Sequence, residues 1–297
     1  MLSSRLLWFI SGTLFGLGTM LFAQQWTHPV RKLIVKQVEQ NAIPSIADDT
    51  AASILQFGHP GPISDDLKRD AYIANYNRRD RNANWVGEHL NRQTLTAGEG
   101  VDRSRSSFRQ DPAIPPMFQA LLKDYFRSGF DRGHQAPAAD ATFTQEAMDE
   151  TFFLTNMAPQ VGVGFNRGYW AYVEEFVRGL VDSYPDVWVW TGELFLPQKG
   201  EDGKFYVKYQ MIGNPPNVAV PTHFYKVVLA KRNETYSTAS FVFPNQPIAN
   251  NITLETFKVA QEAIERASGL MFLTSLPPAA LKDLCVEIKC AVKTQHS

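Results

Sequence analysis

The sequence contains little cysteine and has almost no excess charge of either sign. Only two cysteines occur among 297 residues, Cys285 and Cys290, so a small scaffold held together by many disulfides is excluded. Their spacing fits neither a zinc ligand pair nor a redox C-x-x-C motif. We therefore expect two incidental thiols. A disulfide between them is the alternative, because its formation depends on geometry that the sequence does not show. The formal net charge of -1 excludes a protein that coats a polyanion through bulk positive charge.

Long hydrophobic runs are also scarce, and a mean hydropathy of -0.23 excludes a transporter with many membrane spans. The exception lies between Arg5 and Arg31, where no Lys, Arg, Asp or Glu occurs and residues 6–23 are mainly apolar. As a helix this run would reach about 27 Å, barely the thickness of a hydrocarbon core. We expect residues 1–26 to be a targeting segment or membrane anchor, with a cleaved export signal as the alternative. The following residues 27–69, rich in Pro, Gly and polar side chains, indicate a linker.

Residues 70–297 show neither an internal repeat nor the alternation of strand and helix that a parallel sheet requires. The segments rich in aromatic and β-branched residues predict strands over 70–77, 84–90, 187–190, 209–212, 223–229 and 236–243, the first two as a hairpin. Helical spacing is found over 116–126, 167–181 and 254–267. The chain is thus predicted to hold one α+β domain with a mainly antiparallel central sheet flanked by helices.

Residues that can carry chemistry are concentrated between positions 130 and 178. The first group is Asp131-Arg-Gly-His134. A lone histidine is more often structural than catalytic. Here, however, Gly133 permits tight backbone geometry, and the oppositely charged Asp131 and Arg132 precede it. A histidine with a pKa near neutrality can accept a proton from water. His134 is therefore a candidate general base, provided that an electrophile lies within its reach.

A second polar group follows a predicted buried strand at 152–160. Asn166, Trp170, Glu174 and Arg178 recur every four residues and are expected to share one stripe of a helix over 166–178. The alternative is an ordinary amphipathic helix with a Glu–Arg pair worth about 0.2 to 0.5 kcal/mol. This group supplies the oxygen ligand, carboxylate and cation that His134 alone lacks.

Together the two groups resemble the DNA/RNA non-specific endonucleases of the ββα-metal class, over about residues 70–275. The family's D-R-G-H motif stands at Asp131–His134, and its Asn, Trp, Glu and Arg positions match the second group. Five further segments resemble the mitochondrial members of this family: 84–90, 147–152, 192–197, 218–224 and 264–270. One departure is the loop 161–165, which is about one residue longer than the usual lead-in to the asparagine.

The resemblance implies one Mg²⁺ ion, or Mn²⁺, held directly by Asn166 and otherwise by water and substrate phosphate. It implies that His134 is the general base and that Glu174 positions a metal-bound water. Arg178 would neutralise charge on the phosphate, and Arg132 would contact phosphate or brace the motif.

The family also places an arginine at the phosphate upstream of the D-R-G-H motif, where the match is loose. The candidates are Arg103, Arg105 and Arg109. They lie in the stretch 78–109, in which seven arginines face four carboxylates, so this stretch is locally basic although the whole chain is not. Local placement of arginine, and not the net charge, decides phosphate contacts.

The function implied by the resemblance is cleavage of single- and double-stranded DNA and RNA, leaving 5′-phosphate ends. The implied location is the mitochondrion, at the inner membrane or in the intermembrane space, with the N-terminal segment at the membrane. Roles in mitochondrial nucleic-acid turnover or in DNA degradation during cell death would follow, and a homodimer is expected. Two alternatives are a secreted scavenging nuclease and a catalytically silent nucleic-acid-binding scaffold.

Overall fold

The computed structural model describes residues 46–292, so the expected targeting or anchor segment 1–26 lies outside the described residues. The chain divides into two compact units, residues 1–61 and 62–297. In the first unit the described structure is helix α3 (Ile46–Leu55), whose Leu55 and Ile54 side chains are exposed. Within residues 46–292 we find no helix that is both long and apolar enough to cross a membrane.

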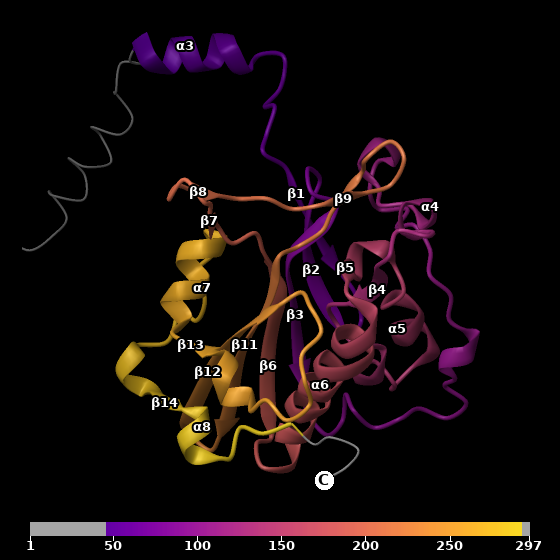
Figure 1. Cartoon of the computed structure of the whole chain (residues 1–297), viewed down its shortest axis with the longest axis vertical. Helices are drawn as coiled ribbons and strands as arrows, with labels where there is room; N and C mark the ends of the chain where they lie inside the picture. The colour runs from indigo at the N-terminus through magenta and orange to yellow at the C-terminus, as the bar shows by residue number, and fades with distance from the viewer. Residues whose placement is uncertain (1–45, 293–297) are drawn as a thin grey trace, which may run out of the picture. The chain divides into compact units, whose positions relative to one another are not determined.

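The second unit is built on an eight-stranded sheet with the order β1-β2-β3-β6-β11-β12-β13, and β14 lies beside β12 (Figure 1). The strands are β1 (Ser64–Lys68), β2 (Tyr72–Asn77), β3 (Asn82–Leu90), β6 (Asp186–Leu194), β11 (His223–Arg232), β12 (Thr235–Pro244), β13 (Lys258–Val259) and β14 (Leu281–Asp283). Every pairing in this sheet is antiparallel except that of β12 with β14. The predicted α+β fold with a mainly antiparallel central sheet is confirmed.

Strand β11 is buried on both faces, and the period of two along the strand divides its side chains between two cores. Phe224 and Val228 pack in the core that contains helix α6 (Trp170–Gly179). Tyr225 and Val227 pack with Ile264 of helix α7 (Gln261–Ser268) in a separate core. The two helices therefore cover opposite faces of the sheet.

Smaller elements complete the second unit. Two-stranded pairs are formed by β4 (Asp131–His134) with β5 (Met157–Gln160), β7 (Gln198–Lys199) with β8 (Phe205–Tyr206), and β9 (Met211–Ile212) with β10 (Val218–Ala219). Short helices are α4 (Leu122–Tyr125), α5 (Gln145–Glu150) and α8 (Leu284–Glu287). Single 3-10 turns occur at Arg103–Arg105, Pro116–Phe118, Ala138–Asp140, Leu154–Asn156, Leu180–Asp182, Leu254–Phe257 and Pro278–Ala280.

The predicted hairpin is confirmed, because β2 pairs antiparallel with β3. The sheet begins before it, at β1, which lies inside the stretch 27–69 that we expected to be a linker; its sequence SDDLK is polar because β1 is an edge strand.

Two predicted helices are wrong as continuous elements. In 116–126, Leu121 is extended and its N–H donates to Asp124 Oδ2 at 2.8 Å, which starts the separate helix α4. In 254–267, pairing of β13 with β12 interrupts the helix, so tertiary pairing overrides local spacing.

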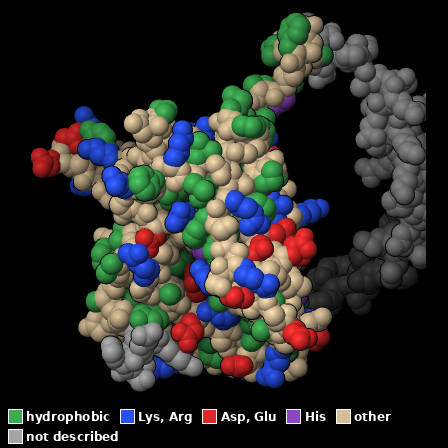
Figure 2. Space-filling model, turned by 90° about the vertical axis from the view of Figure 1, so that its right-hand side faces the viewer, with side chains coloured by type: hydrophobic (Ala, Val, Ile, Leu, Met, Phe, Trp, Pro, Cys, Tyr) green, Lys and Arg blue, Asp and Glu red, His purple; other side chains and the backbone are tan. Residues whose placement is uncertain are grey.

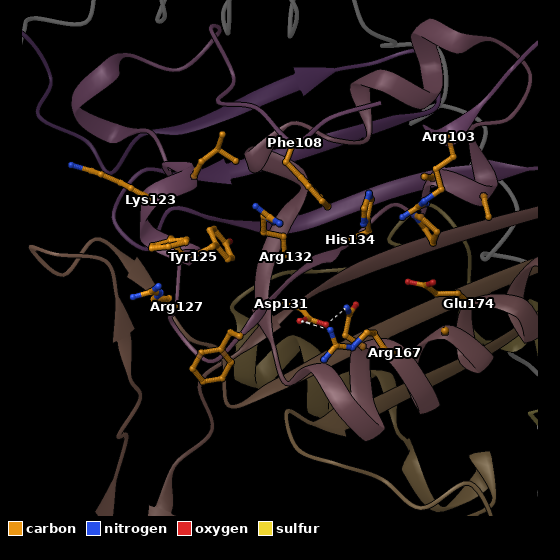
Figure 3. Close-up of a pocket in the computed structure, with 18 residues that line it drawn as sticks. Arg103, Phe108, Lys123, Tyr125, Arg127, Asp131, Arg132, His134, Arg167 and Glu174 are labelled. Atoms are coloured by element: carbon orange, nitrogen blue, oxygen red, sulfur yellow. Dashed lines mark hydrogen bonds and ion pairs between the residues drawn. The ribbon is translucent and has the colours of Figure 1, made fainter. Parts of the chain in front are cut away.

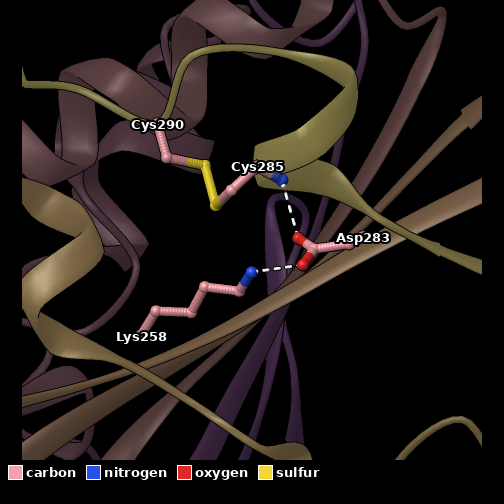
Figure 4. Close-up of a disulfide and its surroundings, with 4 residues drawn as sticks. All are labelled: Lys258, Asp283, Cys285 and Cys290. Carbon is pink, nitrogen blue, oxygen red and sulfur yellow. Dashed lines mark hydrogen bonds and ion pairs between the residues drawn. A yellow bond between two sulfur atoms is a disulfide. The ribbon is translucent and has the colours of Figure 1, made fainter.

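The expectation of two incidental thiols is also wrong, because Cys285 and Cys290 form a disulfide (Figure 4). Cys285 lies in helix α8 and Cys290 just after it, and their Cα atoms are 5.1 Å apart, within the usual range for a disulfide. Asp283 begins this helix: its Oδ1 accepts from the Cys285 N–H at 2.9 Å, and its other oxygen pairs with Lys258. Sequence spacing alone could not supply this geometry.

Candidate active site

The D-R-G-H motif forms strand β4, which pairs antiparallel with β5. Gly133 is buried at the centre of this pairing, and a Cβ atom there would lie 2.1 Å from Gln160 Oε1. Only glycine therefore lets the two strands approach without moving Gln160. The pairing places Asp131 and His134 at opposite ends of β4, and both residues line the same cavity.

The His134 ring lies among aromatic side chains. Its centroid is 5.0 Å from that of Phe152, edge to face, and 5.6 Å from that of Phe108. The buried Nε2 atom has no hydrogen-bond partner among the described residues. Burial, and secondarily the positive charge of Arg103, lower the pKa of His134 to about 3. The imidazole is therefore neutral at physiological pH and keeps a free lone pair.

Asn166 lies in a wide helical turn, Gly162–Tyr169, and not in helix α6. Its N–H donates to the Val161 carbonyl, five residues earlier, at 2.9 Å. Gly164 has a positive φ of 82° and Gly168 is non-helical, so the backbone leaves the regular helix before Trp170. The predicted single helix over 166–178 is thus wrong at its start. The wide turn overlaps the loop 161–165, which we expect to be about one residue longer than in the family.

The Asn166 side chain is held by Asp131. Asn166 Nδ2 donates to Asp131 Oδ2 at 2.8 Å, and Arg167 Nη1 lies 3.3 Å from Asp131 Oδ1. Gly162 makes room for this group, because a Cβ atom there would lie 2.5 Å from Arg167 Nη2. No described residue donates a hydrogen bond to Asn166 Oδ1, so the amide oxygen remains available as a ligand for a hard cation.

Helix α6 carries the remaining predicted residues of the site. The helix packs an apolar face against the main core, where Trp170, Val173 and Val177 are buried. Glu174 faces the cavity from the same helix. Burial raises the pKa of Glu174 to about 7, although the buried cation Lys226 acts in the opposite direction.

Arg178 does not line the cavity. Its Nη1 atom pairs at 2.5 Å with Asp140 Oδ1, an acid that is 4% exposed in the turn after the D-R-G-H strand. The alternative Glu174–Arg178 pair is not among the ion pairs of the described residues. Arg178 therefore ties helix α6 to the segment that follows His134.

A buried lysine lies near Trp170 of helix α6. Lys226 of β11 is 1% exposed, donates from Nζ to Thr191 Oγ1 at 2.7 Å, and lies 4.8 Å from the centroid of the Trp170 ring. Burial lowers its pKa, while the negative charges of Glu174 and Glu88 oppose that change. Such a group is stable only among compensating charges, so α6 rests on a network of buried charges.

The site residues enclose a cavity of about 900 Å³ (Figure 3). His134, Asn166, Glu174 and Asp131 line it together. Five cationic side chains also line it: Arg103, Lys123, Arg127, Arg132 and Arg167. In the view of Figure 2, Lys and Arg side chains border a hollow in the surface of the molecule. Five cations against two carboxylates favour an anionic ligand.

The three upstream arginines differ in position. Arg103 lines the cavity, with its guanidinium carbon 5.1 Å from the centroid of Phe152. Arg105 donates to the Gly100 carbonyl and to Gln145, and Arg109 lies over the ring of Phe153; neither lines the cavity. Arg132 does line it, and its guanidinium carbon lies 4.3 Å from the centroid of Phe108.

Several lining residues were missed by reasoning from the sequence. Lys123, Phe126 and Arg127 come from α4 and the turn after it, and Arg167 comes from the wide turn. None of them belongs to a catalytic motif, although Lys123, Phe126 and Arg167 fall in stretches with helical spacing. The one usable signal was the cluster of charge just before the D-R-G-H strand.

Comparison with known proteins agrees with this geometry. Residues 50–279 match the family described as DNA/RNA non-specific endonuclease. The chain is 53% identical over 243 residues to Nuclease C1 of Cunninghamella echinulata var. echinulata, covering 82% of this chain and 96% of that protein. It is 49% identical over 248 residues to the mitochondrial nuclease of Saccharomyces cerevisiae, covering 81% of this chain and 75% of that protein.

The narrower resemblance, to mitochondrial endonuclease G, is confirmed as well. Human mitochondrial endonuclease G is 44% identical over 224 residues, covering 75% of this chain and 74% of that protein. A crystal structure of the EndoG/EndoGI complex superposes with a TM-score of 0.72 at 43% identity, covering 81% of this chain and 96% of that chain. With its D-R-G-H strand and its asparagine brought to one cationic cavity, this chain belongs to the DNA/RNA non-specific endonuclease family and is similar to its mitochondrial members.

Proposed function

We propose that this chain is an endonuclease that hydrolyses phosphodiester bonds in single- and double-stranded DNA and RNA, irrespective of the sugar, and leaves 5′-phosphate ends. The observation that carries the proposal is the cavity itself, which is lined by a neutral histidine with an unpartnered nitrogen, an asparagine with a free amide oxygen, and five cations.

His134 acts as the general base in this proposal. Its free Nε2 can accept a proton from a water that attacks phosphorus. The pKa of about 3 in the free protein makes it a weak base there. A bound phosphate brings negative charge into the cavity and favours the imidazolium, so substrate binding raises the pKa of His134 toward the working range.

The donors in the cavity fit a magnesium ion, with manganese as the alternative. Asn166 Oδ1 would hold the ion, and Glu174 would orient its waters. Within residues 46–292 no group of three or more His, Cys, Asp or Glu side chains is suited to a metal. Magnesium tolerates such sparse protein ligation because it keeps several waters. When bound, the metal would supply stabilisation of negative charge on the phosphate.

The cationic lining residues bind and orient the phosphate. Among the described residues, neither Arg103 nor Arg132 forms an ion pair, so both guanidinium groups can neutralise phosphate charge. Arg105 and Arg109 are left to contact a longer nucleic acid outside the cavity. The logarithm of the binding constant should then fall with the logarithm of salt concentration by about 0.9 per phosphate contacted on duplex DNA.

We assign the protein to the mitochondrion, with roles in nucleic-acid turnover or in DNA degradation during cell death. The names of the yeast and human relatives support the organelle. The Cys285–Cys290 disulfide favours an oxidising compartment such as the intermembrane space, and is equally compatible with the alternative of a secreted nuclease. N-terminal sequencing of protein from native cells distinguishes a retained anchor at the inner membrane from a cleaved signal. A homodimer remains an expectation, which sedimentation of the purified protein tests.

The activity is tested with the full-length chain on plasmid DNA and on RNA, with Mg²⁺ and with EDTA. Cleavage of both substrates only with metal is the expected result. His134→Ala should lower the rate by about 10²- to 10⁴-fold. Wild-type protein that binds DNA but never cuts it would instead support the silent scaffold.

A further inference from the structure

A large aromatic side chain stands exposed at one end of the cavity. Phe126 lines the cavity that contains His134, yet 71% of its surface is exposed. Its predecessor Tyr125 is 5% exposed and belongs to a core. Single exposed apolar side chains are common on proteins, but this one lies beside the site, where its ring is accessible to a ligand.

The backbone holds Phe126 in this outward position. Helix α4 ends at Tyr125, Phe126 is extended, and Arg127 takes a left-handed conformation with φ of 55°. A non-glycine residue is rarely found there, and such conformations gather at binding sites. The guanidinium carbon of Arg127 lies 5.1 Å from the centroid of the Phe126 ring. The turn therefore presents an aromatic face together with a cation.

Phe126 also belongs to a second hollow, of about 320 Å³. Lys123, Phe126 and Arg127 line both this hollow and the cavity, while Gln210 and Asn214 line the hollow alone. In Figure 3, Lys123 and Arg127 lie at the opposite end of the cavity from Arg103 and Glu174, with His134 between. A nucleic-acid strand whose phosphate lies at His134 can thus place a neighbouring nucleotide on Phe126.

We propose that Phe126 is a stacking platform for one unpaired base next to the scissile phosphate, with Lys123 and Arg127 binding the adjoining backbone. This rests on the proposed function and adds a preference for single-stranded or locally unpaired nucleic acid. A base inside a duplex is covered on both faces by its neighbours and cannot offer a face to Phe126. Stacking does not depend on sequence or sugar, because every base has a π face. The amides of Gln210 and Asn214 can meet the base edge.

The test measures binding by the full-length chain in EDTA, which prevents cleavage. The ligands are a labelled single-stranded 12-mer and the matching blunt duplex. Phe126→Ala should weaken binding of the single strand by about 5- to 140-fold, which is the equivalent of about 1 to 3 kcal/mol for one stacked base. Binding of the duplex should weaken by less than about twofold. Phe126→Trp should retain single-strand binding. The matched control is Phe205→Ala, which removes a phenylalanine of nearly equal exposure, 70%, that lines neither hollow.

A second readout reports stacking directly. A 12-mer with 2-aminopurine beside a central phosphate should lose fluorescence on binding wild type and Phe126→Trp, and lose much less on binding Phe126→Ala. Equal single-strand affinity and equal quenching for Phe126→Ala and wild type would overturn the proposal, as would an equal loss on the duplex. Cleavage by wild type in Mg²⁺ is measured in parallel. If wild type cuts but Phe126→Ala binds like wild type, only the stacking proposal fails; if wild type does not cut, the proposed function fails.

Discussion

Asn166 Nδ2 donates a 2.8 Å hydrogen bond to Asp131 Oδ2, so the first residue of the D-R-G-H motif orients the amide of the proposed metal ligand. The two residues come from different elements, β4 and the wide turn before α6. Because the nitrogen is engaged, the oxygen Oδ1 is the atom left for a cation.

Asp131→Ala should therefore weaken metal binding by about 10- to 100-fold, the usual effect of removing a group that orients a ligand. Asp131→Asn can still accept from Asn166 and should weaken it less. Binding of Mn²⁺ followed by electron paramagnetic resonance, without nucleic acid, checks both variants. Equal affinities for Asp131→Ala and wild type would show that Asp131 does not orient Asn166.

Glu174 makes the stability of the protein depend on pH. Its pKa is about 7 in the folded protein and near 4.5 when exposed, so the unfolded chain loses this proton first as pH rises. The favourable contribution of protonated Glu174 is complete below about pH 4.5 and is lost as pH rises through 7. We therefore compare the free energy of unfolding of Glu174→Gln with that of wild type at pH 5 and at pH 8. The difference should shift in favour of the variant by about 2 kcal/mol as pH rises from 5 to 8.

Urea unfolding in EDTA at both pH values measures this difference. Glu175→Gln is the matched control, because Glu175 lies on the same helix and is exposed. A constant difference between Glu174→Gln and wild type at pH 5 and 8 would contradict the prediction.

Arg178→Ala leaves Asp140 buried without its cation, and should lower the free energy of unfolding by about 3 to 5 kcal/mol. If Arg178 acts by holding α6, the double variant Asp140→Ala/Arg178→Ala should be more stable than Arg178→Ala and should recover part of its cleavage rate. If Arg178 instead neutralises phosphate charge directly, the double variant should recover stability but no activity. Unfolding curves and cleavage rates of wild type, Arg178→Ala and the double variant decide between these roles.

Replacing both cysteines by serine should lower the free energy of unfolding by about 2 kcal/mol, the loop-entropy value for a bridge of this short span. The disulfide residues do not line the cavity, so the cleavage rate should stay within about twofold of wild type. Urea unfolding with and without a reducing agent provides the measurement. Wild type that is equally stable with and without reductant would argue against the bridge.

The sequence could predict the parts of the site that belong to local motifs. His134 and Asn166 are predicted from short patterns, and the sheet is predicted from segments rich in aromatic and β-branched residues. The wide turn at Asn166 was not predicted, because a four-residue spacing does not reveal where the regular helix begins. Pairing between distant segments was also hidden, as for Asp140 with Arg178. The burial of Lys226 was not predicted either, because a lysine in a strand is usually exposed and the helix that covers it is distant in the sequence.

The pairing of β4 with β5 has a consequence for when the cavity exists. His134 and Asn166 meet at one cavity only when these two strands have paired and the following turn has closed on Asp131. A chain threaded through a membrane in unfolded form contains every residue of the motif but no cavity. Assembly of the fold would then serve as the activation step, and the nucleic acids of the compartment where the chain is made would be spared.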